Sequence, residues 1–175
     1  MKLKSDNLCF RTPVMEDAEA LMLLKNNEKA AFLLGGIHHS YSLDDIINWI
    51  NYHNNNSEEV LLIIEDTATN KIIGHVGLYK IDYIAKKTEF GILIADDDSR
   101  GKGYGTKSTK LMIDFAFNEL GMHKVTAEVL YENTPSVAMF KKCGFSVDGC
   151  LRDDVFKNNR YYDVLTMSIL QSEQE

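Results

Sequence analysis

Hydrophobic and polar residues follow two different periods along this 175-residue chain, one typical of helices and one typical of strands. Apolar residues recur at helical spacing in 16–25 and 42–53, and acidic residues at the start of both segments suit a helix N-terminus. Apolar runs at 60–65, 71–81 and 88–95 are separated by short polar turns and predict three strands. Short connections between strands predict an antiparallel meander.

The second half of the chain alternates between the two periods. Helices are expected at 104–120 and 135–142, and strands at 123–130, 145–151 and 161–169. With a short strand at 8–11, the order is β-α-α-β-β-β-α-β-α-β-β. It predicts one α/β (α+β) domain over 1–175, built as a mixed, mostly antiparallel seven-stranded sheet with helices on both faces.

Composition narrows the range of partners and compartments. The net charge is −7 and no long basic run occurs, so neither nucleic acid nor a membrane is expected as a partner. The N-terminal residues lack the apolar segment of a secretory signal, and a cytoplasmic protein is expected. The three cysteines form no C-x-x-C pair, and with the histidines they show no metal-ligand spacing, so no metal is expected.

A glycine-rich loop between the expected strand 88–95 and the expected helix 104–120 carries the chemistry. Gly101, Gly103 and Gly105 stand at alternate positions directly before the helix. Glycines in this place let backbone amides converge on one point, and the helix N-terminus adds a positive dipole end. The sequence therefore predicts an anion site that suits a phosphate.

Two common phosphate motifs fail at the same residue. A nucleotide P-loop, G-x-x-x-x-G-K-S, matches at Lys107 and Ser108 but requires glycine where Thr106 stands. The dinucleotide fingerprint G-x-G-x-x-G also requires glycine there. The loop does fit the pattern R-x-x-G-x-G, beginning at Arg100.

With this loop the chain resembles the GCN5-related N-acetyltransferase (GNAT) superfamily, over almost its whole length. The further blocks are T-E-F-G-I-L-I-A before the loop, Y-E-N-T-P-S at 131–136, F-K-K-C-G-F at 140–145, and the C-terminal tail from Gly149. They are similar to the branch of ribosomal-protein, polyamine and amino-sugar acetyltransferases. The resemblance implies an N-acetyltransferase that moves the acetyl group of acetyl-CoA to a primary amine by direct attack in a ternary complex.

The resemblance also implies a cofactor site. Strand 88–95 is expected to splay from strand 123–130, leaving room for the pantetheine arm, which would pair with the backbone of strand 88–95. The loop amides would hold the diphosphate. The cofactor-binding residues implied in this way are Ile92, Leu93, Ile94, Arg100, Gly101, Lys102, Gly103, Tyr104, Gly105, Thr106, Asn133 and Lys142.

Glu89 is the candidate general base. A carboxylate of pKa ~4.3 takes a proton from an alkylammonium of pKa ~10.4 inefficiently, so transfer through water is favoured over direct abstraction. The alternative is a surface glutamate beside Lys87.

Phe140 stands where most relatives have a tyrosine that is thought to protonate the departing thiolate. Phenylalanine has no such proton, and Tyr131 or Tyr104 are the candidate substitutes. This departure leaves open an alternative function, a catalytically weak CoA-binding or regulatory module. The acceptor is expected to be a small amine, an amino sugar or a protein N-terminus, and a homodimer is expected because relatives often form dimers.

Overall fold

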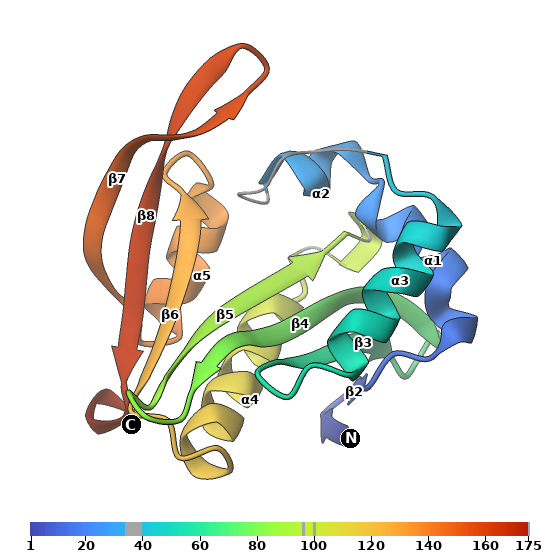
Figure 1. Ribbon diagram of the computed structural model, residues 1–175, viewed down its shortest axis with the longest axis horizontal. Helices are drawn as coiled ribbons and strands as arrows, with labels where there is room; N and C mark the ends of the chain where they lie inside the picture. Colours follow the sequence, from blue (N-terminus) through green and yellow to red (C-terminus); the bar gives the residue numbers. More distant parts are fainter. Residues whose placement is uncertain (34–39, 96, 100, 175) are drawn as a thin grey trace.

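The computed structural model describes residues 1–33, 40–95, 97–99 and 101–174, which form one sheet with helices on both faces (Figure 1). The strands are β1 (Lys2–Ser5), β2 (Leu8–Arg11), β3 (Val60–Asp66), β4 (Lys71–Asp82), β5 (Lys87–Ile94), β6 (Lys124–Leu130), β7 (Ser146–Lys157) and β8 (Arg160–Leu170). The α-helices are α1 (Ala18–Lys25), α2 (Glu28–Leu33), α3 (Leu43–Asn54), α4 (Tyr104–Asn118) and α5 (Thr134–Lys142). Short 3₁₀ turns cover Met15–Asp17, Asp97–Ser99 and Gln171–Glu173.

The sheet confirms the predicted class. Its strand order is β1-β2-β3-β4-β5-β6-β8-β7, and among these neighbours only β5 and β6 run parallel. The strand count is a correction: the sheet has 8 strands and not seven. The additional strand, β1, pairs with β2 and sets Leu3 opposite Phe10. Because its other residues are polar and half-exposed or exposed, the sequence pattern alone does not reveal it.

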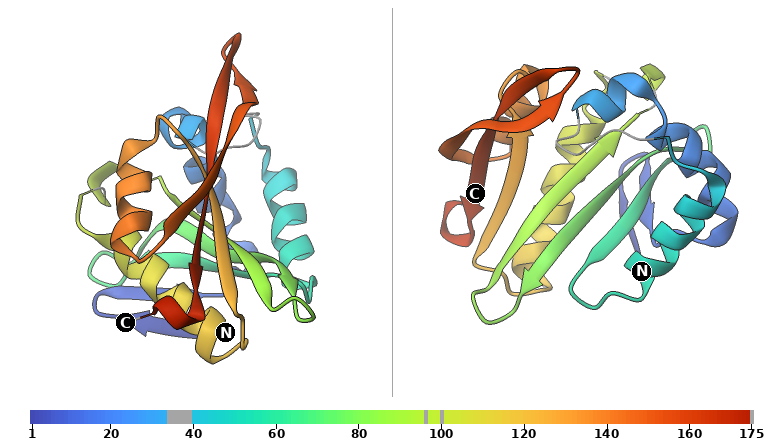
Figure 2. Two further views of the ribbon diagram at one scale, coloured as in Figure 1. Left: turned by 90° about the vertical axis from the view of Figure 1, so that its left-hand side faces the viewer. Right: turned by 45° about the horizontal axis from the view of Figure 1, so that its top comes forward.

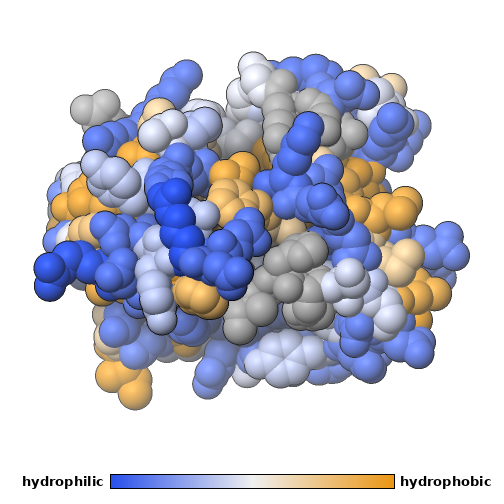
Figure 3. All heavy atoms as spheres, turned by 90° about the horizontal axis from the view of Figure 1, so that it is seen from above, coloured by the Kyte–Doolittle hydropathy of each residue, from blue (hydrophilic) through white to orange (hydrophobic). Residues whose placement is uncertain are grey.

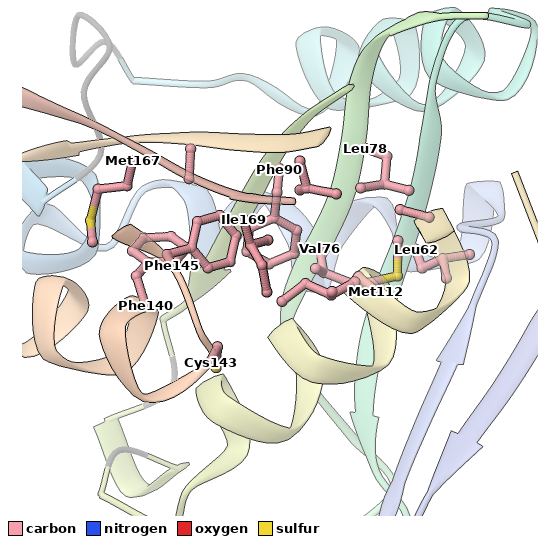
Figure 4. Close-up of a cluster of buried hydrophobic side chains, with 14 of the residues drawn as sticks. Leu62, Val76, Leu78, Phe90, Met112, Phe140, Cys143, Phe145, Met167 and Ile169 are labelled. Atoms are coloured by element: carbon pink, nitrogen blue, oxygen red, sulfur yellow. The ribbon is translucent and has the colours of Figure 1, made fainter. Parts of the chain in front are cut away.

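Two layers of helices cover the sheet. The main core lies under α4 and α5 and includes Leu62 of β3 and Met112 of α4 (Figure 4). Ile64 of β3 and Phe117 of α4 belong to the same cluster. Ile63, between those two β3 residues, faces the opposite way into a smaller core under α1 and α3. This alternation is the period-two pattern of a strand that is buried on both faces.

The C-terminal strands form a long twisted hairpin that projects beyond the rest of the sheet (Figure 2). Asn158 and Asn159 close it, with φ angles of 49° and 58°, as the sequence predicts for a tight turn. β7 continues past the predicted end at residue 151. An irregularity between Leu151 and Val155, with Asp153 at φ 53°, interrupts the alternation that would have revealed the extension.

Candidate active site

The central feature of the site is the divergence of β5 from β6. The two strands pair only over Lys87–Glu89 and Lys124–Thr126, where the Thr126 hydroxyl adds a 3.2 Å bond to the Thr88 carbonyl. Beyond these residues β5 pairs with β4 alone and β6 with β8 alone, and the two strands separate (Figure 1). The expected splay is therefore present. From Phe90 onward, one edge of β5 has backbone groups that can pair with an extended ligand.

A cavity of about 470 Å³ lies at this splay. Seen from that end of the molecule, hydrophobic side chains gather between two more polar regions (Figure 3). The cavity brings together most of the residues predicted to bind the cofactor: Ile92, Leu93, Ile94, Gly101, Gly103, Tyr104, Gly105, Thr106 and Asn133. Lys102 and Lys142 are exposed and do not line it, and Arg100 lies outside the described residues.

The glycine loop has the geometry of an anion cradle. Gly101 and Gly103 have φ angles of 75° and 78°, in the left-handed region where other residues are strained. A Cβ atom placed on either glycine would meet nothing within 4 Å, so the space beside both is open. Gly103 is also the N-cap residue of α4 and has no side chain with which to cap it. The first amides of α4 therefore remain available to a ligand oxygen.

Gly105 has a different role from the other two glycines. It lies in the first turn of α4, and an added Cβ would make ordinary contacts, 3.7 Å from Met139 Sδ and 3.8 Å from Ile94 Cδ1. Both neighbours line the cavity. Gly105 thus keeps the cavity wide, whereas Gly101 and Gly103 permit the turn of the backbone.

Tyr104 lines the cavity, but its hydroxyl is already bonded to other parts of the protein. The hydroxyl accepts a 2.8 Å bond from the Asn7 side chain and donates a 3.1 Å bond to Asp66 Oδ2. These partners lie at the β2 and β3 side of the sheet, away from β6. The suggestion that Tyr104 protonates the thiolate is therefore not supported by its geometry.

Asn133 lies on the opposite side of the splay, after β6. It is buried, and its side-chain oxygen caps α5 by accepting a 3.3 Å bond from the Ser136 amide. Its side-chain amide points to the Leu33 carbonyl at 3.5 Å. One residue therefore fixes the start of α5 and contacts the end of α2, and both elements line the cavity.

Phe140 is a core residue. It is 4% exposed and packs edge-to-face against Phe90 and Phe145, with ring centroids 6.0 Å and 5.1 Å away (Figure 4). Tyr131 is 60% exposed, and neither residue lines the cavity. The structure therefore gives Phe140 an apolar packing role in the core, next in the chain to Met139, which does line the cavity.

Glu89 lies at the narrow end of the splay, in the last residue pair that joins β5 to β6. Its carboxylate accepts a 2.7 Å bond from Lys80 Nζ, and this interaction raises the pKa of Lys80. The partner is thus Lys80 of β4 and not the neighbouring Lys87. The side chain is 30% exposed, so water reaches the carboxylate.

Beside Glu89, on the same face of the sheet, lies a polar and aromatic cluster that the sequence did not single out. Tyr79 is directly opposite Glu89 on β4, and burial, together with nearby carboxylates, raises its pKa. His53 and His75 stand 4.8 Å and 5.1 Å from the Trp49 ring, and Lys25 Nζ lies over the same ring at 4.4 Å. Neither ring nitrogen of His75 has a hydrogen-bond partner among the described residues. The sequence does not predict that these polar side chains under α3 are buried, because their burial arises only when α3 packs on β4.

The described residues contain no group of three histidine, cysteine or acidic side chains arranged to hold a metal ion. Nor is any described helix both long and apolar enough to cross a bilayer.

Comparison with known proteins decides the family. Residues 7–146 match the model of the acetyltransferase (GNAT) domain. The chain belongs to the GNAT family. A spermidine N(1)-acetyltransferase of Vibrio cholerae is 37% identical over 131 residues, which cover 75% of each chain.

Solved structures agree with this assignment. The crystal structure of spermidine N-acetyltransferase from Vibrio cholerae in complex with CoA and spermine superposes with a TM-score of 0.88 and 32% identity, covering 95% of this chain and 97% of the other. A GNAT-family acetyltransferase from Bacillus anthracis shares the fold, with a TM-score of 0.85 and 21% identity over 99% and 100% of the two chains. This GNAT protein is therefore an acetyl-CoA-dependent N-acetyltransferase that acts on a primary amine. The alternative of a module without catalysis is not favoured.

Proposed function

We propose that acetyl-CoA lies along the splay with its diphosphate on the loop 101–106 and its pantetheine arm against Ile92–Ile94. The observation that carries this proposal is that the amide cradle and the unpaired edge of β5 open into one cavity. Open space beside Gly101 and Gly103 leaves room for phosphate oxygens close to the backbone. Asn133 forms the opposite wall. When bound, acetyl-CoA supplies an acetyl group activated as a thioester.

The loop 101–106 binds charge through backbone amides, and each amide bond to a charged oxygen is stronger than a bond between neutral groups. Lys102 lies next to the cradle, with Nζ 6.0 Å from the centre of the Tyr104 ring, and adds positive charge near the diphosphate. Lys142, in the last turn of α5, does not line the cavity and has no role in this arrangement.

Glu89 is the proton acceptor in this proposal and acts through water. An amine attacks only when it is neutral, and an alkylammonium with a pKa of ~10.4 must first lose a proton. The Glu89 carboxylate is partly exposed at the narrow end of the splay, so it can accept a hydrogen bond from a water molecule that takes up the proton of the ammonium. Lys80 fixes the carboxylate from the other side at 2.7 Å.

The leaving thiolate receives no proton from position 140, because Phe140 has none to give. A thiol titrates near ~8.5, so a thiolate leaves at modest cost without a positioned acid. Tyr131 is largely exposed and outside the cavity lining, which leaves solvent water as the proton source.

The acceptor class that we propose is a small cationic polyamine. Two observations support it: the Vibrio cholerae relatives act on spermidine, and the chain carries a net charge of −7, which attracts cations. The test is a product assay with spermidine, an amino sugar and an N-terminal peptide in parallel, followed by mass spectrometry.

Spermidine is expected to give the highest kcat/KM. Glu89→Gln is expected to lower turnover below the pKa of the amine, with partial recovery as the pH rises and more acceptor is neutral. Preference for the peptide or the amino sugar would refute the acceptor class. A defect of equal size at every pH would refute the role of Glu89 as a base.

We further propose that the protein works in the cytoplasm and associates with copies of itself. Three cysteines without a disulfide suit a reducing compartment. A relative from Vibrio cholerae forms a dodecamer, and β7 here is an edge strand with mostly exposed side chains, open to a second copy.

A further inference from the structure

The short helix α2 contacts both sides of the splay. Its beginning contacts the end of β5, and its end contacts the β7–β8 hairpin and Asn133, which follows β6. At its start, the Asn27 side chain caps the helix by accepting a 3.1 Å bond from the Ala30 amide. The same side chain donates a 3.1 Å bond to the carbonyl of Ala95, just after β5. Ala30 itself is buried against Leu93 and Ala95. The beginning of α2 is therefore attached to the β5 side.

The other end of α2 is attached to the β6 side, through the β7–β8 hairpin. Lys157 of β7 donates a 3.0 Å bond to the carbonyl of Phe32 and a 3.5 Å bond to that of Ala31. The Phe32 ring packs edge-to-face on Tyr162 of β8 at 5.7 Å. Asn133 adds its 3.5 Å contact to the carbonyl of Leu33.

Lys157 has an unusual environment for a lysine. It is 8% exposed, and its ammonium meets the C-terminal carbonyls of α2, where the helix dipole favours a positive charge. Nζ also lies 5.7 Å from the centre of the Phe32 ring. A helix of six residues has little stability of its own, so contacts at its two ends decide where it sits.

We propose that α2 is a strap across the wide end of the splay and that Lys157 is the positioning residue that fixes it. Ala30 and Leu33 of α2 line the same cavity as the glycine loop. The strap therefore sets the width of the cavity where the acceptor amine must approach the bound thioester. This inference rests on the proposed function of the cavity, but the attachment of α2 by Lys157 can be tested without it.

The first test is hydrogen exchange of the protein without ligands, read at the amides of 28–33. Lys157→Met keeps the length of the side chain and removes the ammonium. It is expected to speed exchange in α2, while Lys157→Arg, which keeps the charge, restores protection. Lys124→Met is the matched control, because it removes an ion pair to Asp148 on the same sheet without contacting α2. Unchanged exchange in Lys157→Met would refute the attachment.

The second test is the kinetic consequence. Lys157→Met is expected to raise the KM of the acceptor roughly tenfold, because misplacing a cavity wall costs productive alignment. kcat and the Kd of acetyl-CoA, which depends mainly on the loop 101–106, are expected to change little. Faster exchange with an unchanged acceptor KM would refute the strap's role in the reaction. If the unaltered protein acetylates no amine, the proposed function fails, and hydrogen exchange still decides the attachment.

Discussion

At the scale of single residues, the side chain at position 140 has no proton to give to the departing thiolate. The resemblance to GNAT proteins predicts a tyrosine there, and this chain has phenylalanine. The structure adds that the ring is packed between Phe90 and Phe145 and that the nearest candidate substitutes are badly placed. Tyr104 directs its hydroxyl to Asp66, and Tyr131 faces solvent. Hydrogen-bond partners of this kind depend on contacts between distant segments, so the motif could not supply them.

Phe140→Tyr is expected to raise kcat by no more than roughly tenfold, below most of the range for a positioned acid, because position 140 does not line the cavity and a thiolate already leaves readily. Steady-state kinetics of this variant beside Tyr131→Phe provide the measurement, and Tyr131→Phe is expected to match the unaltered protein. A hundredfold gain would contradict departure without an acid, as would a large loss in Tyr131→Phe.

At the scale of elements, helices and strands were predicted correctly where the pattern of residues within the segment itself indicates the structure. The helix expected over 42–53 is confirmed as α3, and Ser42 caps its start by accepting a bond from the Asp45 amide. The strand expected over 88–95 is also confirmed as β5, and its residues alternate between the faces of the sheet, since Phe90 and Leu93 lie in different cores. β1 and α2 were missed because each is short and is held by partners far away in the sequence, as Asn27 and Lys157 show for α2.

The packing of α1 and α3 on the sheet buries the ammonium of Lys25, which has no acidic partner among the described residues. Burial lowers the pKa of this lysine from 10.5 to about 8, although the rings of Tyr41 and Trp49 partly stabilise the ammonium. Burial also lowers the pKa of the nearby His75, which is therefore neutral at pH 7. The folded state binds the Lys25 proton less tightly than the unfolded state, so folding is less favourable below pH 8 than above pH 10.

Lys25→Met is expected to stabilise the protein at pH 7 by ~1–3 kcal/mol, because it removes this cost while keeping the apolar stem. The advantage should shrink as the pH rises from 8 to 10, because the folded state of the unaltered protein loses the Lys25 proton near pH 8, whereas the unfolded state keeps it until the pH approaches 10.5. Urea unfolding of both proteins across this range measures the difference. If the difference in the free energy of unfolding between the two proteins stays constant with pH, burial of the charge is not its cause.

At the scale of the whole molecule, the fold class and the acetyltransferase family could be predicted from the sequence, because four motif blocks occur in the expected order. The width and walls of the cavity could not be predicted. They depend on where β5 leaves β6, on the strap α2, and on the hairpin that holds it. The acceptor surface is assembled from elements on both sides of the splay, and no single segment carries a pattern for it.

The central claim is that the loop 101–106 is the diphosphate site of an acetyl-CoA cavity, and calorimetric titration tests it most directly. The unaltered protein is expected to bind acetyl-CoA at least ~100-fold more tightly than S-acetylpantetheine, which lacks the diphosphate and the nucleoside attached to it. Gly103→Val is expected to abolish that difference, because its side chain enters the open space beside the cradle and resists the positive φ. Gly121→Val is the control, since Gly121 also has open space beside it and a φ of 66°, but lies after α4, away from the cavity. Near-normal acetyl-CoA affinity in Gly103→Val, or equal affinity of the unaltered protein for both ligands, would contradict the claim.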